Sequence, residues 1–187
     1  MAFVLETRTQ RFSFGDSWSR GVSFDKENDL HKIKECMDPI STKDADFICL
    51  HSSGALWLIE VTDYRKNPPH LRADIEAGTL AEDTAQKVRD TIPALIGAYR
   101  SAEKPNRWNP YTRALADRKH DLSIILWLED DPDSRRQSDL YAQSQRVILR
   151  DRLKQKLAWL TKQVMVEGRH ANTRATLDIK VEDIPSH

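Results

Sequence analysis

Two carboxylates stand where short apolar runs of the chain begin or end. Glu60 follows the five apolar residues 55–59, and Asp46 opens the run "DFICL". If the two side chains meet, they repel one another unless a cation lies between them, and carboxylate oxygens are ligands that Mg²⁺ and Mn²⁺ prefer. The residues alone also allow a structural interpretation, in which Glu60 is a solvated charge at a strand end and Asp46 belongs to a loop. For an isolated pair of carboxylates this is the commoner case.

A β-hairpin would bring Asp46 and Glu60 together. The segments on either side of the turn at 52–54 have the composition of strands. In such a hairpin the start of the first strand lies beside the end of the second. Side chains alternate between the faces of a strand, so Glu60 and Thr62 share one face. We therefore expect the two carboxylates at one rim of a sheet, with Thr62 next to Glu60.

Composition limits the kind of protein that could carry this pair. The 187 residues are enough for one domain with a sizeable core, and 29 Lys and Arg balance 29 Asp and Glu. This balance gives no argument for or against nucleic acid as a partner. Cys36 and Cys49 have no close spacing, which fits a reducing compartment. No signal peptide or apolar run of membrane length is evident, so we expect a cytoplasmic protein without a membrane partner.

The hydrophobic pattern predicts the elements around the hairpin. Helices are expected at 26–37 after an N-cap at Asp25, at 79–100 with a kink or break at Pro93, and at 143–166, with Ile148 and Val164 facing the core. Further strands are expected at 121–130 and 174–184, a β segment within 3–24, and an irregular loop at 104–113.

This order predicts an α/β fold with a mixed central sheet that is flanked by helices and covered on both faces. We expect a single domain over 1–187, with an N-terminal β extension at 1–24 and a core at 25–130. A C-terminal helix and strand within 143–184 would complete the fold. The chain has only six glycines and no glycine-rich phosphate loop, which disfavours a nucleotide cradle.

The element order and the tripeptide Glu60-Val61-Thr62 resemble the PD-(D/E)XK nuclease superfamily, which has the restriction-endonuclease-like fold. The match runs over about 27–130, and "LIEVTDYR" looks like the family's second motif with its lysine replaced by Thr62. The resemblance implies a metal-dependent nuclease that hydrolyses phosphodiester bonds of DNA or RNA. Asp46, Glu60 and the carbonyl of Val61 would hold Mg²⁺ or Mn²⁺, and Glu27 could be an accessory carboxylate. An exposed Glu27 in the first helical turn is the alternative.

The missing lysine needs a replacement if the protein is an enzyme. Thr62 carries no charge, and losing a positioned acid–base group costs on the order of 10²–10⁴ in rate. Lys87 stands at the edge of the apolar face of the helix 79–100, beside Gln86, and is the replacement that we rank first. The catalytic set would then be Asp46, Glu60 and Lys87. The alternative for Lys87 is a solvated lysine at the helix edge.

Other cations are candidates for contacts with nucleic acid. Arg65 and Lys66 follow the second hairpin strand, and Arg107 and Arg113 flank aromatic residues in "RWNPYTR". A loop packed on the core by its aromatic residues explains the second pair equally well. The implied partners are DNA or RNA, with a homodimer or a larger defence-type complex as further associations. The competing interpretation is a degenerate nuclease-fold domain that acts as a nucleic-acid-binding or protein-interaction module.

Overall fold

A computed structural model describes residues 2–37, 42–101, 103, 105–130, 139–169 and 177–185. Its centre is a mixed five-stranded sheet with the order β3-β4-β5-β6-β7. These strands are β3 (Trp18–Ser23), β4 (Phe47–His51), β5 (Leu56–Asp63), β6 (Leu122–Glu129) and β7 (Gln163–Glu167). The pairs β3–β4 and β4–β5 are antiparallel, whereas β5–β6 and β6–β7 are parallel. The predicted α/β class with a mixed sheet is confirmed.

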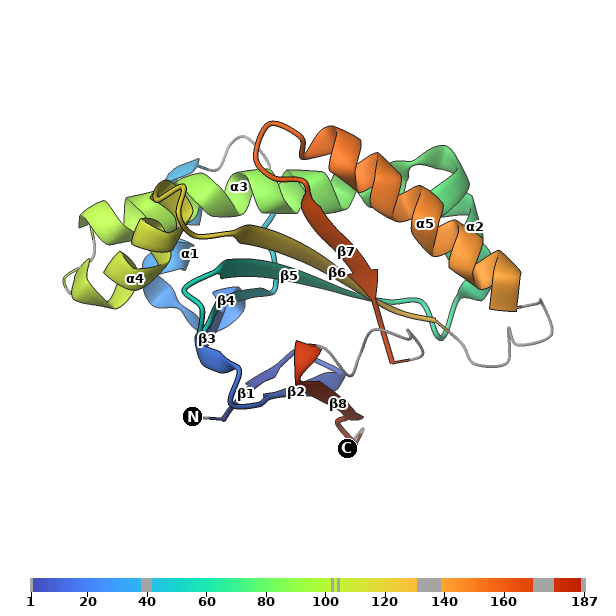
Figure 1. Cartoon of the computed structure of the whole chain (residues 1–187), viewed down its shortest axis with the longest axis horizontal. Helices are drawn as coiled ribbons and strands as arrows, with labels where there is room; N and C mark the ends of the chain where they lie inside the picture. The colour runs from blue at the N-terminus through green and yellow to red at the C-terminus, as the bar shows by residue number, and fades with distance from the viewer. Residues whose placement is uncertain are drawn as a thin grey trace.

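Helices cover one face of this sheet, and a second sheet covers the other face (Figure 1). The helices are α1 (Asn28–Met37), α2 (Pro68–Ala77), α3 (Thr79–Ser101), α4 (Pro105–Ala116) and α5 (Asp139–Lys156). The second sheet is antiparallel and joins both ends of the chain: β1 (Phe3–Glu6), β2 (Gln10–Phe14) and β8 (Ile179–Asp183). Both faces are thus covered as expected, but the second layer is a sheet and not helices.

The alternation of side chains along β5 separates two apolar clusters. Leu56 and Leu58 belong to the cluster under the helices, whereas Trp57 and Ile59 belong to the cluster between the sheets. The turn before β5 is as predicted, with Gly54 at a positive φ of 87° that glycine adopts without steric cost. The next even-numbered residue, Glu60, therefore continues the row that faces the helices.

The segment predicted as an irregular loop at 104–113 is largely the helix α4. Pro105 begins this helix, where its missing N–H is no loss. Trp108, Tyr111 and Ala114 recur at helical spacing, and all three are buried in the cluster under the helices. The burial of this face outweighs the cost of Pro110 inside the helix. The prediction of a loop was wrong because it gave the prolines more weight than the apolar spacing.

The predicted helix at 143–166 ends earlier than expected. Helix α5 stops at Lys156, and Val164 lies in β7, whose residues alternate between the two faces of the sheet. Ile148 does not face the core, since it is 42% exposed. The prediction was wrong because Val164 happens to continue the helical spacing of the apolar residues of α5. The sequence does not mark the turn between α5 and β7 with Gly or Pro.

Two further helix predictions need correction. Asp25 is not the N-cap of α1 but lies in a short 3-10 turn (Phe24–Lys26), and α1 begins at Asn28. Helix α3 runs through Pro93 as one helix of 23 residues. Helix α2, which begins at the Pro68-Pro69 pair, was not predicted from the sequence. No helix in the described part of the chain has the length and apolar character needed to cross a membrane.

Candidate active site at the end of the β4–β5 hairpin

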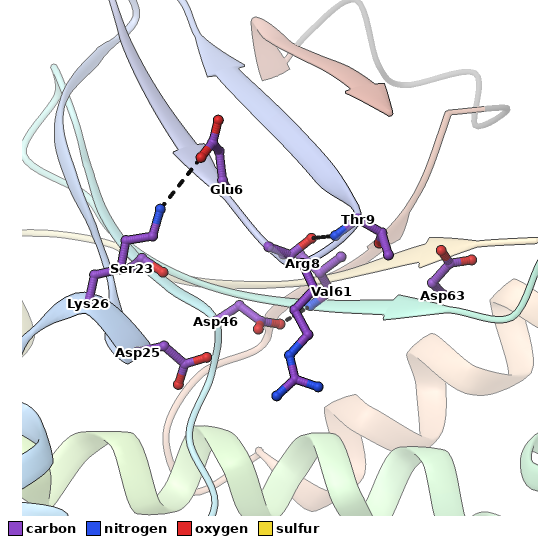
Figure 2. Close-up of a pocket in the computed structure, with 10 residues that line it drawn as sticks. Glu6, Arg8, Thr9, Ser23, Asp25, Lys26, Asp46, Val61 and Asp63 are labelled. Carbon is purple, nitrogen blue, oxygen red and sulfur yellow. Dashed lines mark hydrogen bonds and ion pairs between the residues drawn. The ribbon is translucent and has the colours of Figure 1, made fainter. Parts of the chain in front are cut away.

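The hairpin brings Asp46 and Glu60 together, as the sequence predicts. Phe47 pairs with Ile59, so the next pair outward is Asp46 opposite Glu60. Oδ2 of Asp46 accepts a hydrogen bond of 2.7 Å from the backbone N–H of Val61 (Figure 2). This bond fixes the Asp46 carboxyl across the end of the hairpin. The three residues expected to hold a metal ion, including Val61, are therefore neighbours.

Lys87 completes the cluster from α3. Its Nζ forms an ion pair with Oε1 of Glu60, which is 2% exposed, while the Lys87 side chain is 32% exposed. Lys87 therefore lies beside Glu60, next to the predicted metal ligands. Thr62 follows Glu60 on the same face of β5 and carries no charge. The cation that pairs with Glu60 therefore comes from helix α3 and not from strand β5.

Both carboxyl groups of this cluster have pKa values above their ordinary range. Burial, followed by the charge of Asp46, raises the pKa of Glu60 to about 8, although Lys87 opposes this shift. Burial also raises the pKa of Asp46, while the Val61 hydrogen bond and Lys87 oppose the change. Two carboxyl groups held this closely retain a proton unless a cation compensates their charge. A metal ion at this pair would therefore have to compete with a proton.

Lys87 keeps its positive charge at neutral pH. Burial acts to lower the pKa of Lys87, but the carboxylates of Glu60 and Asp46 outweigh burial and raise that pKa above its ordinary value. An ammonium group in this state can offset negative charge and donate hydrogen bonds, but it cannot accept a proton. The chemistry open to Lys87 is charge stabilisation.

Helix α3 also holds the backbone that leads to Asp46. The Thr91 hydroxyl accepts a hydrogen bond of 2.9 Å from the Ala45 N–H, and Asp90 accepts one of 3.1 Å from the Lys43 N–H. Thr91 is fully buried and lies one turn after Lys87 on the same helix. One helix therefore positions both sides of the cluster, a role that sequence reasoning missed. The signal in the sequence was Thr91 itself, a polar residue within the apolar row of the helix, at i+4 from Lys87.

The oxygen atoms present fit a hard divalent cation. Oε2 of Glu60 is buried and receives no N–H or O–H donor among the described residues, and the Asp46 carboxyl lies beside Glu60. A bound cation, or a proton shared between the two carboxyl groups, would satisfy this oxygen. Carboxylate and carbonyl oxygens are the donors that Mg²⁺ and Mn²⁺ take. Within the same residues, no cluster of three or more His, Cys, Asp or Glu side chains is arranged to hold a metal. Asp46, Glu60 and the Val61 carbonyl would need help from water or substrate oxygens.

The other predicted site residues make contacts of their own. Arg65 pairs with Asp63 and Asp183, each at 2.6 Å, so its guanidinium is already engaged at the end of β5. Arg107 pairs with Glu27 in a separate hollow between the start of α1 and α4. This contact engages Glu27, the proposed accessory carboxylate, away from the Asp46–Glu60 pair.

Two predicted cations remain exposed. Lys66 lies in the turn after β5, and Arg113 lies near the end of α4. Neither takes part in an ion pair within the described residues. The structure therefore brings together the predicted metal ligands and Lys87, and it leaves the four predicted nucleic-acid contacts dispersed over two other regions.

A groove beside the cluster was not predicted. Asp46 and Val61 line it together with Asp25 from the 3-10 turn and Arg8 from the β1–β2 turn (Figure 2). Sequence reasoning gave the N-terminal segment no part in the site, because nothing in residues 3–24 indicates where that segment docks. Comparison of the chain with protein-family models, with curated proteins and with solved structures finds no match.

Proposed function

We propose that this protein is a metal-dependent nuclease that hydrolyses phosphodiester bonds of DNA or RNA, with a restriction-endonuclease-like core. The observation that carries the proposal is the ion pair between Lys87 and Glu60 beside Asp46. In this proposal Lys87 supplies the cation that the nuclease motif would otherwise take from a lysine at the position of Thr62. Without such a cation, the two carboxylates would be a metal half-site with no group to offset charge on a phosphate.

Each residue has a defined part in this proposal. Asp46 and Glu60 would hold Mg²⁺ or Mn²⁺ together with the Val61 carbonyl. The ion, when bound, polarises a phosphoryl group and lowers the pKa of a bound water. Lys87, which stays protonated, offsets the negative charge that develops on the phosphate and donates hydrogen bonds to it. Thr91 holds the backbone of Ala45 and so keeps Asp46 opposite Glu60.

The experiment that tests the proposal is a cleavage assay on plasmid DNA and on RNA with Mg²⁺ or Mn²⁺. We expect cleavage by the wild type that EDTA abolishes, and a loss of on the order of 10²–10⁴ in rate for Asp46→Asn and for Lys87→Ala. Lys156→Ala is the matched control, because Lys156 also forms an ion pair with a glutamate, Glu82, but on exposed helix surfaces. Equal rates for all four proteins would contradict the proposal.

A second candidate is a nuclease-like domain that binds nucleic acid or a protein partner without cleaving. Thr62 favours it, and so does the raised pKa of Glu60, because a protonated carboxyl is a poor metal ligand. This candidate predicts binding with no metal-dependent cleavage. The assay above separates it from the first. Association as a homodimer or within a larger complex is a further proposal, as is a cytoplasmic location, which the unpaired Cys36 and Cys49 support.

A further inference from the structure

One side of the groove beside Asp46 consists of residues that have no part in the proposed catalytic set. Its volume is about 430 Å³, which falls within the range of about 300–1,000 Å³ typical of small-molecule sites. The hairpin and the 3-10 turn form one side, and the β1–β2 turn forms the other (Figure 2). The lining residues are Glu6, Thr7, Arg8, Thr9, Ser23, Asp25, Lys26, Asp46, Val61 and Asp63. A ligand in this groove would touch both Asp46 and the N-terminal segment.

Arg8 stands at the tip of the β1–β2 turn with its charge available. Of the two cations that line the groove, Lys26 pairs with Glu6 at 3.6 Å. Arg8 is exposed, and among the described residues it makes no ion pair. Figure 2 shows its side chain extending from the turn past Val61 toward the side of the sheet on which α3 lies. The guanidinium thus reaches the region of the groove in which Asp46 lies.

The turn that carries Arg8 is held by internal hydrogen bonds. The Thr7 N–H donates to the Gln10 carbonyl at 2.9 Å, and the Thr7 hydroxyl accepts from the N–H groups of Gln10 and Thr9 at 3.2 Å and 3.4 Å. Pairing of β1 with β2 and of β2 with β8 anchors the turn to the second sheet. The backbone under Arg8 is therefore preorganised, which lowers the entropic cost of a contact made by its side chain.

The chemistry of Arg8 selects an anion that presents two neighbouring oxygen acceptors. A guanidinium stays protonated at any physiological pH, and its fork of N–H donors matches a phosphate in a bidentate manner. The groove also contains four carboxylates against two cations, so its own charge repels a phosphate. Arg8, and a divalent ion on Asp46, would each offset part of this charge for an anion in the groove.

We propose that Arg8 binds a backbone phosphate of the nucleic acid whose scissile bond lies at Asp46 and Glu60. This inference rests on the proposed function and extends it, because it makes the β1–β2 turn the second wall of the substrate site. A contact to phosphate carries no sequence information, so Arg8 contributes affinity for any sequence. It also makes affinity depend on salt, since each neutralised phosphate releases condensed counterions.

The test is equilibrium binding of a short fluorescein-labelled single-stranded DNA, and of the RNA of the same sequence, by fluorescence anisotropy in Mn²⁺. Lys87→Gln in every protein slows cleavage during the measurement. Adding Arg8→Ala should weaken binding about tenfold at low salt and reduce the slope of log affinity against log salt by about one. Arg8→Lys keeps the charge but loses the fork of donors, so its affinity should lie between that of the Lys87→Gln background and that of the Arg8→Ala variant.

The matched control is Arg118→Ala in the same background. Arg118 is exposed and lies in the loop before β6, near the start of β5 at Leu56 and therefore away from Glu60. If Arg8→Ala and Arg118→Ala bind alike, with the same salt slope, the Arg8 proposal is overturned. Circular dichroism of the Arg8 variant checks its fold, which the exposed side chain should leave intact.

The binding and cleavage readouts separate this proposal from the proposed function. Arg8-dependent binding without metal-dependent cleavage would support the phosphate contact and contradict the nuclease. Cleavage by the wild type, together with unchanged cleavage and binding by Arg8→Ala, would support the nuclease and overturn the phosphate contact. A wild type that neither binds nor cleaves either polymer would overturn both.

Discussion

Glu60 and Glu129 are buried glutamates near the ends of neighbouring parallel strands, but their surroundings differ. Glu60 is 2% exposed and Glu129 is 1% exposed. Glu129 accepts a hydrogen bond of 2.6 Å from the Trp127 indole and pairs with Arg169 at 3.2 Å. Glu60 pairs with Lys87 through one oxygen, and its other oxygen has no hydrogen-bond partner among the described residues. The two glutamates are thus equally buried, but they differ in how many hydrogen-bond and ion-pair partners their oxygens have.

The two glutamates also face different layers of the molecule. Glu129 lies on the face toward the second sheet, where Arg169 connects it to Asp183 of β8. It therefore helps to join the C-terminal strand to the core. Glu60 faces α3 and has the Asp46 carboxyl beside it instead of a second donor. The comparison teaches that a buried carboxylate alone does not mark a site. The signs of function are the unsatisfied oxygen and the second carboxylate.

The largest difference is expected in catalysis. We predict that Glu60→Gln lowers the rate of metal-dependent cleavage by on the order of 10²–10⁴, because it removes a metal ligand while keeping the shape of the side chain. Glu129→Gln keeps an acceptor for the Trp127 indole and should cleave like the wild type. The measurement is the initial rate on one labelled substrate at saturating Mn²⁺. Similar losses in both variants would break the distinction between the two glutamates.

For stability we expect the opposite order, with the larger effect from a substitution at Glu129 than from one at Glu60. We predict that Glu129→Ala lowers the free energy of unfolding by about 1–3 kcal/mol, because the buried Trp127 N–H loses its acceptor and Arg169 loses a partner. Urea denaturation followed by tryptophan fluorescence and by circular dichroism measures this change. Glu60→Gln, in contrast, should not lower the free energy of unfolding at pH 8 in the absence of metal. A destabilised Glu60→Gln under those conditions would count against the account.

The pH dependence of stability provides a third test. The pKa of Glu60 in the folded protein is about 8, above its ordinary value of 4.5. Between these values the unfolded chain loses a proton that the folded chain retains, so this group makes the folded state less stable as pH rises from about 4.5 to 8. In EDTA, Glu60→Gln should therefore gain on the order of 1–3 kcal/mol relative to the wild type between pH 5 and pH 8. A difference between the two proteins that does not change with pH contradicts the raised pKa.

The smallest effect is expected from the support of Asp46 by α3. Thr91→Val removes the acceptor for the Ala45 N–H and should cost about 1 kcal/mol in stability. It should also raise the Mn²⁺ concentration at which cleavage reaches half its maximal rate, because Asp46 is held less firmly. Thr112→Val is the control, because the Thr112 hydroxyl bonds only to carbonyls of its own helix. Equal metal dependence in the two variants would show that Thr91 does not position the site.

Sequence reasoning predicted the parts of the site that depend on local pattern. The apolar runs around the turn at 52–54 specify a hairpin, and alternation along a strand then fixes the face of Glu60 and Thr62. Lys87 was predicted from its place at the edge of the apolar row of its helix together with the resemblance to the nuclease superfamily, which implies that this helix packs beside the site. Only the hairpin and the face of Glu60 follow from a period and a turn, which a single sequence contains.

The remaining parts depend on contacts between distant segments. The pairing of β2 with β8 joins residues near positions 12 and 181, and no local pattern specifies that partner. The groove with Arg8 exists only because this second sheet docks on the core, so a single sequence does not reveal it. The helix α4 and the strand β7 were missed for a different reason, since tertiary burial overrode the local signals of proline and of helical spacing.

The central claim is that Asp46 and Glu60 form a site for a divalent cation beside Lys87. The most direct measurement is a titration of Mn²⁺ followed by electron paramagnetic resonance, carried out on the wild type, Glu60→Gln and Glu129→Gln. The account predicts one class of bound Mn²⁺ in the wild type and in Glu129→Gln, and its loss in Glu60→Gln. Absence of bound Mn²⁺ in the wild type, or equal binding by Glu60→Gln, would contradict it.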